Sequence, residues 1–232
     1  MYRNHLKRIF DFALALAALV CLSPLLLALT AAGAVAMRGN PFFAQWRPGR
    51  DERLFRLVKF RTMTNARDAA GNLLPDGERL NAYGRLLRST SLDELPELLN
   101  VVKGDMALVG PRPQLVRDMV FMTPGQRRRH SVRQGITGLA QVGGRNAVSW
   151  EEKIERDLEY VRDVTFAGDL KILFATVAAV LGRKGVSEEG CDTATDLCDH
   201  LLASGKIDRD EYDRGREEAE RLIAAASGRG CA

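Results

Sequence analysis

Hydrophobic residues are concentrated at the N-terminus of the chain. The stretch IFDFALALAALVCLSPLLLALTAAGAVAM, from Ile9 to Met37, contains a single charged residue, Asp11. It is longer than the roughly 20 residues that cross the hydrocarbon core of a bilayer. It also exceeds the apolar region of a cleaved signal peptide. The pattern therefore predicts a membrane segment that remains in the protein.

The pair Ser23-Pro24 interrupts this segment near its middle. Proline removes a helical hydrogen bond and clashes with the preceding turn, so the helix either crosses the bilayer with a kink or turns back. Each arm has only about 14 residues, which suits a re-entrant segment better than a span. Basic flanks prefer the cytoplasmic side, and they lie on both sides of the segment: Arg3, Lys7, Arg8, Arg38, Arg47, Arg50 and Arg53. We therefore favour the re-entrant arrangement, with Ser23 and Pro24 as the break.

Short strand patterns follow the apolar segment. RLVKFRTM alternates, which predicts a strand with Lys59 and Arg61 on one face. MALVGPRP predicts a short apolar strand that runs into a rigid turn, where Pro111 and Pro113 restrict the backbone of Arg112.

Helical patterns dominate the rest of the chain. Ser149 and Glu152 have capping-box spacing, which predicts the start of the helix WEEKIERDLEYVRDV. Asp169 is expected to cap LKILFATVAAVL, which is too short to span a bilayer but suits a membrane surface or a core. After Gly185 the sequence becomes highly charged and predicts two short amphipathic helices joined near Gly205.

These patterns predict a mostly helical α/β chain in three parts. Residues 1–38 form the helix-break-helix segment. Residues 39–186 form a compact cytoplasmic domain with amphipathic interfacial helices and a small strand element. Residues 187–232 form a helical C-terminal appendage, which we expect to serve packing or assembly.

Composition narrows the chemistry. The chain has 232 residues, a net charge of +4, four cysteines and three histidines. The histidines are scattered, without HExxH or GxSxG, so zinc proteases and triad hydrolases are poor candidates. The cysteine spacing fits neither a redox pair nor a zinc site, which indicates free thiols at Cys21, Cys191, Cys198 and Cys231. We expect no nucleic-acid partner.

The stretch SLDELPELLN places two acids side by side. Ser91 and Glu94 have capping-box spacing, and Asp93 is an alternative N-cap before Pro96. A functional interpretation is equally specific, because adjacent acids near cations suit phosphate chemistry. One acid can bind Mg²⁺ while the other attacks phosphorus. Arginine gives bidentate contacts to phosphate, and the candidate residues are Lys59, Arg61, Asp93, Glu94, Arg112, Arg145 and Asp157.

Several motifs together resemble one known family closely. They are KRIFDFALALAALVCLSPLLL, VKFRTM, LRSTSLDELPELLNVVKGDMALVGPRP, GITGLAQVGGRN, WEEKIERDLEYV and DLKIL, between about Arg3 and Val186. The family is the bacterial sugar transferases, the monotopic polyprenyl-phosphate phosphoglycosyl transferases that initiate glycan assembly. Its members carry a re-entrant helix broken at a Ser-Pro pair, which strengthens the topology expected here.

The resemblance implies a two-step reaction. Asp93 attacks the β-phosphorus of a UDP-sugar, UMP leaves, and polyprenyl phosphate then takes the sugar phosphate from the aspartate. Glu94 matches the Mg²⁺-binding acid, Arg112 matches the arginine that holds phosphate, and Lys59 assists it. The resemblance also implies a monotopic protein of the bacterial inner membrane that faces the cytoplasm, with downstream glycosyltransferases as further partners.

Nucleotide-sugar recognition is assigned by the resemblance to Arg145 and Asp157. The chain departs from the family at Gln134, where proline is usual, and at Gly143, where asparagine is usual. We expect both changes to make the loop around Arg145 more flexible.

Two other functions remain open from the sequence. One is an aspartyl-phosphate phosphatase, although the common DxDx(T/V) signature is absent. The other is a catalytically silent membrane scaffold.

Overall fold

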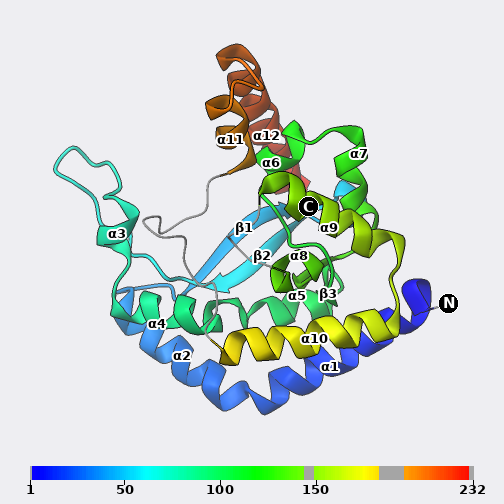
Figure 1. Ribbon diagram of the computed structural model, residues 1–232. Coiled ribbons are helices and arrows are strands. Elements are labelled where there is room, and N and C mark those ends of the chain that lie inside the picture. The colour runs from blue at the N-terminus through cyan, green and yellow to red at the C-terminus, as the bar shows by residue number, and fades with distance from the viewer. Residues whose placement is uncertain (1, 144–148, 183–195, 230–232) are drawn as a thin grey trace.

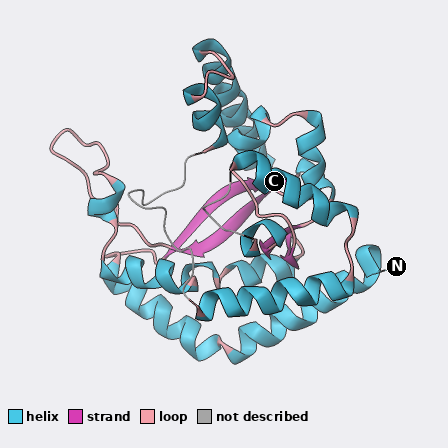
Figure 2. Cartoon of the chain, viewed as in Figure 1, coloured by secondary structure: helices cyan, strands magenta, loops and turns pink. Residues whose placement is uncertain are grey.

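Helices account for most of the chain (Figures 1 and 2). The computed structural model describes residues 2–143, 149–182 and 196–229. Its helical elements are η1 Tyr2–Leu6, α1 Lys7–Cys21, α2 Ser23–Ala36, η2 Arg50–Glu52, α3 Asp76–Arg79, α4 Ala82–Thr90, η3 Leu92–Glu94, α5 Glu97–Lys103, α6 Val116–Phe121, α7 Pro124–Arg127, η4 Arg128–Ser131, α8 Leu139–Val142, α9 Trp150–Arg162, α10 Phe166–Leu181, α11 Leu197–Ala203 and α12 Arg209–Arg229.

Two small sheets provide the strand element. β1 (Phe42–Pro48) and β2 (Leu54–Phe60) pair antiparallel as a hairpin, and β3 (Met106–Val109) and β4 (Gln134–Thr137) pair in parallel. The mostly helical α/β class predicted from the sequence is therefore confirmed.

The N-terminal apolar segment forms two helices. α1 ends at Cys21, α2 begins at Ser23, and the two are bent by 65°. Pro24 lies in the first turn of α2, where its missing N–H costs little, and the Ser23 hydroxyl donates to the Val20 carbonyl at 2.7 Å. Within the described part of the chain no single helix is long and apolar enough to cross a membrane, whereas the bent pair together is.

Both arms of the bent pair are fastened to the rest of the fold. α1 packs on α5, and Ala15 is buried in a core with Phe55, Leu57, Leu98, Val101 and Met106. α2 is held by α4, since the Tyr83 hydroxyl donates to the Leu29 carbonyl at 2.9 Å and the Asn81 amide donates to the Ala36 carbonyl at 3.1 Å.

The single charge of the apolar segment also faces the interior. Asp11 is buried and accepts a hydrogen bond from the backbone N–H of Leu108 in β3 at 3.3 Å. The Lys7 ammonium lies 3.5 Å from Asp11 and 2.6 Å from Asp169 in α10. Tyr160 donates to the other oxygen of Asp169 at 2.8 Å. Asp169 thus joins three elements and is not the helix cap expected from the sequence, because α10 already begins at Phe166.

One side of the molecule is strongly apolar. Figure 1 shows α1, α2 and α10 along the same side, with α11 and α12 at the opposite side. Large apolar side chains are exposed on all three helices, among them Ile9, Phe10, Leu14, Val20, Leu27, Val35, Phe174 and Val177. Water-exposed surfaces of this kind mark interaction with a membrane or another protein.

The C-terminal appendage packs on α6. Val116 and Met119 of α6 are buried against Ala219 of α12. The backbone N–H of Leu197, at the start of α11, donates to the Asp118 carboxylate at 2.9 Å. Two helices separated near Gly205 were expected, and the chain adopts them as α11 and α12.

Candidate active site

The adjacent acids lie in a 3₁₀ turn between two helices. Ser91 ends α4 with a left-handed backbone (φ 56°), and Asp93 and Glu94 follow in η3 before α5 begins at Glu97. Neither Ser91 nor Pro96 makes a side-chain capping bond. The capping interpretations of Ser91 and Asp93 are therefore wrong, because Ser91 makes no cap bond to η3 and the N-cap position of α5 is Pro96.

Glu94 lies between two cations. Its Oε1 atom accepts from the Lys59 ammonium at 2.7 Å and from the Arg112 guanidinium at 2.5 Å. Burial alone would raise the pKa of Glu94, but Arg112 and Lys59 outweigh it and hold the pKa well below its usual range. The negative charge of Glu94 in turn raises the pKa of Arg112 and outweighs the effect of burial. The structure thus brings together three residues that lie far apart in the sequence.

Asp93 is half-buried beside this cluster. Burial raises the pKa of its carboxyl, and the negative charge of Glu94 raises it further, while Lys59, Arg112 and Arg88 oppose the rise. No residue that the structure describes forms a hydrogen bond to the Asp93 carboxylate. The two acids therefore differ: Glu94 is engaged by cations, and Asp93 keeps its oxygens available for a substrate.

A third acid, Glu97, was missed by the sequence analysis. It is 1 % exposed and lies 3.0 Å from the Lys59 ammonium. Burial raises the pKa of Glu97 to about 7, helped by the charge of Glu94 and opposed by Lys59. Its position one helical turn after Asp93 was the available signal, since residues three or four apart share a helical face.

The backbone around Lys59 and Arg112 is fixed by buried polar groups. The Asn100 side chain accepts from the Val58 N–H at 3.1 Å and donates to the Arg56 carbonyl at 2.8 Å, which holds β2 against α5. Arg112 follows β3, and its carbonyl accepts from the Arg129 guanidinium at 2.6 Å.

The Asp157 carboxylate forms a buried ion pair with Arg129. Its Oδ2 atom accepts two hydrogen bonds from Arg129, at 2.6 and 2.9 Å, and both side chains are almost fully buried. The contact of Arg129 with the Arg112 carbonyl gives this pair a positioning role. Nucleotide-sugar binding by Asp157 stays a prediction.

Two other sequence expectations concern the loop around Arg145. Arg145 lies outside the described residues, so its role in nucleotide-sugar binding also stays a prediction. Gln134 is fully buried in β4, and its amide donates to the carbonyls of Arg129 and Val132 at 3.3 and 3.2 Å. Gln134 therefore lies in a strand, and the expected effect of Gln134 and Gly143 on the loop around Arg145 stays a prediction, because residues 144–148 lie outside the described residues.

The acids of the site suit a divalent cation only in part. Over residues 2–143, 149–182 and 196–229 no group of three or more His, Cys, Asp or Glu has metal-binding geometry. Mg²⁺ commonly takes only one or two carboxylates and fills its other positions with water and substrate phosphate. Because Oε1 of Glu94 serves the two cations, its second oxygen is the candidate ligand. One carboxylate oxygen completed by water and substrate phosphate fits Mg²⁺.

Most of this chain is similar in sequence to known proteins. Residues 2–183 match the family model described as bacterial sugar transferase. The uncharacterized sugar transferase EpsL of Bacillus subtilis is 50% identical over 189 residues, covering 82% of this chain and 94% of the relative. The exopolysaccharide production protein ExoY of Sinorhizobium fredii is 34% identical over 196 residues, covering 77% of this chain and 87% of the relative.

A third relative has a more informative name. The undecaprenyl-phosphate galactose phosphotransferase of Salmonella typhimurium is 37% identical over 198 residues, which cover 78% of this chain but only 41% of the relative. The family match ends before α11, so the appendage lies outside it. Because the match takes in η1 through α10 and every residue of the Lys59–Glu94–Arg112 cluster, the chain belongs to the bacterial sugar transferase family.

Proposed function

We propose that the protein is a membrane-anchored phosphoglycosyl transferase. It transfers a sugar 1-phosphate from a UDP-sugar to polyprenyl phosphate through a covalent intermediate on Asp93. The observation that carries this proposal is the division between the two acids, with Glu94 held by Lys59 and Arg112 and Asp93 beside it. The name of the Salmonella relative supports the same class of reaction.

In the first step, an oxygen of Asp93 attacks the β-phosphorus of the donor. The P–O bond to the α-phosphate breaks, and UMP leaves with the bridging oxygen. A carboxylate needs no separate base for this attack, because it is already ionised at neutral pH. We assign Arg112 and Lys59, which contact Glu94 next to Asp93, to stabilise the negative charge of the phosphoryl group during transfer.

In the second step, a phosphate oxygen of the acceptor attacks the same phosphorus. The bond to Asp93 breaks, which restores the carboxylate and forms the polyprenyl diphosphate sugar. The acceptor is itself an anion, so this step also proceeds without a strong base. The half-buried position of Asp93 favours the lipid-linked phosphate over water by limiting access to the intermediate.

Mg²⁺ is the cofactor we propose for the site. Glu94 would hold the ion, which would neutralise charge on the donor diphosphate. Lys59 and Arg112 keep Glu94 ionised and oriented for that role.

The membrane attachment follows from the apolar side of the molecule. We propose that α1 and α2 enter one leaflet of the bacterial inner membrane as a re-entrant pair and that α10 lies at its surface, so that the domain stays on the cytoplasmic side. The core around Ala15 holds α1, and hydrogen bonds from Asn81 and Tyr83 hold α2, so both arms contact the same domain, as this topology requires.

Incubation with a labelled UDP-sugar and Mg²⁺ tests the proposal. Without acceptor, the protein should release UMP once per site, and the peptide that contains Asp93 should gain the mass of one sugar phosphate. Added polyprenyl phosphate should then convert the adduct to a lipid-linked product. UMP release only in the presence of acceptor, with no trapped adduct, would favour direct transfer. Free sugar phosphate would indicate a phosphatase, and absence of turnover a silent scaffold.

A further inference from the structure

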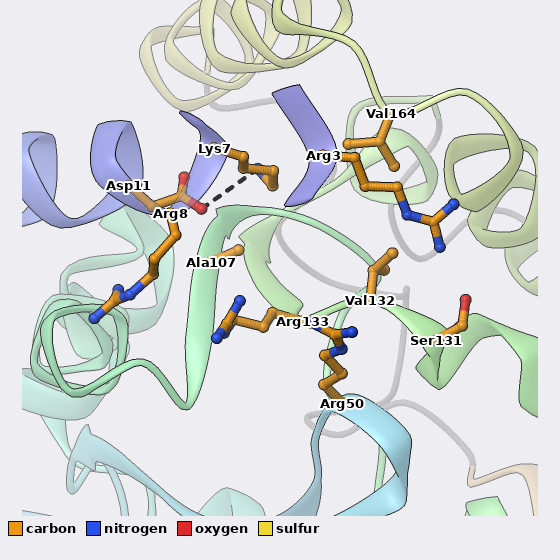
Figure 3. A pocket seen from close by; sticks show the side chains of 10 residues that line it. All are labelled: Arg3, Lys7, Arg8, Asp11, Arg50, Ala107, Ser131, Val132, Arg133 and Val164. Carbon is orange, nitrogen blue, oxygen red and sulfur yellow. Dashed lines mark ion pairs between the residues drawn. The ribbon is translucent and has the colours of Figure 1, made fainter. Parts of the chain in front are cut away.

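A basic cavity of about 270 Å³ lies beside the first turns of α1 (Figure 3). None of the candidate active-site residues Lys59, Glu94 and Arg112 lines this cavity. It is bounded by the N-terminal segment, the turn before β2, the strand β3 and the loop that follows η4. Its charged lining residues are Arg3, Lys7, Asp11, Arg8, Arg50 and Arg133.

The positive charge of this cavity is not balanced within its lining. Lys7 is neutralised by Asp169 and Asp11, at 2.6 and 3.5 Å, so the single acidic side chain of the lining is already engaged. Arg50 lies 3.3 Å from Asp51, but both side chains are more than half exposed, and such pairs contribute little. The four arginines therefore leave an excess of positive charge at one place.

Two of these arginines are held in position by the end of α5. Arg8 donates to the carbonyls of Val101 and Val102 at 2.5 and 2.8 Å, and Nε of Arg133 donates to the Gly104 carbonyl at 2.8 Å. A guanidinium has five N–H donors, so each arginine retains donors beyond those that cap the helix.

Arg50 and Arg133 lie close together in the cavity (Figure 3), whereas Arg8 extends toward the end of α5. Figure 3 shows the guanidinium of Arg50 beside Arg133 in the middle of the view, with Arg3 on the other side. The pKa of Arg133 is lowered by burial and then by the positive charges of Arg8 and Arg50. A bound anion would relieve this mutual repulsion, and arginine clusters of this kind suit phosphate.

The cavity is remote from the candidate active site but close to the apolar side of the molecule. Asp93 precedes α5, whereas the cavity adjoins its far end near Gly104, roughly 15 Å away at 1.5 Å per helical residue. The exposed apolar residues Ile9 and Phe10 directly follow the basic lining residue Arg8 in the sequence. An anion in the cavity would therefore sit where α1 enters the apolar phase.

We propose that this cavity binds the phosphate group of a membrane phospholipid. The proposal rests on the membrane attachment proposed above, and it assigns the arginines a role apart from the transfer reaction. Binding would fix the depth and tilt of α1 at the headgroup level, because the phosphate and the apolar face of α1 would be held by the same lipid leaflet.

Native mass spectrometry of the full chain in detergent tests the site. The probes are short-chain phosphatidylglycerol, diacylglycerol with the same acyl chains, and inorganic phosphate. Arg50→Gln removes a cavity charge without removing a helix cap, and Arg53→Gln, at an exposed position outside the cavity, is the matched control. We expect one retained phosphatidylglycerol per chain, retention about fivefold weaker in Arg50→Gln, and wild-type retention in Arg53→Gln. Arg50→Glu should abolish retention.

Each outcome separates the sources of the anion. Equal retention of diacylglycerol, or equal losses in Arg50→Gln and Arg53→Gln, would overturn the proposal. Arg50-dependent binding of inorganic phosphate without a preference for the lipid would support the anion site but overturn its assignment to a phospholipid. Asp93→Asn should keep the bound phospholipid while losing transferase activity, so failure of this proposal and failure of the proposed reaction are distinguishable.

Discussion

The Arg129 guanidinium connects the buried carboxylate of Asp157 to the backbone carbonyl of Arg112. It donates to Asp157 at 2.6 and 2.9 Å and to the Arg112 carbonyl at 2.6 Å. The position of Arg112, and through it the ion pair with Glu94, therefore depends on a pair of residues outside the cluster itself.

Asp157→Asn should destabilise the fold as well as lower activity. The substitution leaves the fully buried guanidinium of Arg129 without its counter-charge, and breaking a buried pair in this way costs about 3–5 kcal/mol. Thermal unfolding and steady-state kinetics measure the two effects. Asp163→Asn, exposed near the end of α9, is the control. An unchanged Tm with a raised KM for the UDP-sugar would instead support the nucleotide-sugar role predicted from the sequence.

Asp93→Asn should abolish transfer while the protein still folds and binds membranes. It keeps the size of the side chain but removes the attacking anion, so the rate should fall at least about a thousandfold, or roughly 4 kcal/mol. Glu94→Gln should also be severe, but through weaker Mg²⁺ binding, and raised Mg²⁺ should recover part of the rate. Turnover and adduct formation measure the difference. Adduct formation by Asp93→Asn would refute the nucleophile assignment.

Glu97→Gln should change how stability depends on pH. The folded protein raises the pKa of Glu97 from 4.5 to about 7, so the native state binds an extra proton between these values. The contribution of Glu97 to the free energy of unfolding is thus fully present below about pH 4.5 and is lost as the pH rises through 7. The Tm of Glu97→Gln minus the Tm of the wild type should therefore increase as the pH rises from 5.5 to 8.

Asp163→Asn, at an exposed position near the end of α9, is the control for this pH dependence. It should shift Tm by the same amount at pH 5.5 and at pH 8. A Glu97→Gln curve parallel to the wild type would contradict the assignment to Glu97.

Loss of the appendage should lower stability more than activity. α12 covers Val116 and Met119 of α6, and burying each such side chain contributes about 1.5–3 kcal/mol. A chain that ends at Glu189 should therefore retain turnover, because the phosphate-handling residues precede it, but should unfold at a lower temperature. Ala219→Asp places a charge in the same contact of the full chain and should lower Tm likewise. An inactive truncated protein that is folded and membrane-bound would show that the appendage is required for catalysis.

Both flanks of the bent helix pair should be accessible from the cytoplasm. Single cysteines at Tyr2 and Gln45, in a background without the native cysteines, test this by labelling from each side of the membrane. Replacement of Ser23 and Pro24 by leucine and alanine should favour a straight helix that spans the bilayer, with loss of activity. Labelling of Tyr2 or Gln45 only from the outside would disprove the re-entrant topology.

The sequence alone was enough for the features that depend on local patterning. Hydrophobic runs, strand alternation and the Ser149 cap predicted the pair α1–α2, the strands β2 and β3 and the helices α9 to α12. Ser149 does accept a hydrogen bond from the Glu152 N–H at 3.1 Å. Gly104 follows α5 with a left-handed backbone (φ 97°), the position where glycine commonly ends a helix. The long motif around Asp93 was specific enough to indicate the family.

The tertiary structure decided which charges meet. Asp11, a lone acid in an apolar segment, binds the Leu108 N–H in β3 and Lys7, which also pairs with Asp169 of α10. Glu97 shares Lys59 with Glu94 although β2 and α5 are distant in the sequence. Sequence spacing could not show that Asp169 forms an ion pair instead of capping a helix, because its partner Lys7 lies 162 residues earlier in the chain. Ion pairing depends on distance in space and on loss of solvent, and neither quantity is encoded in the local pattern of the chain.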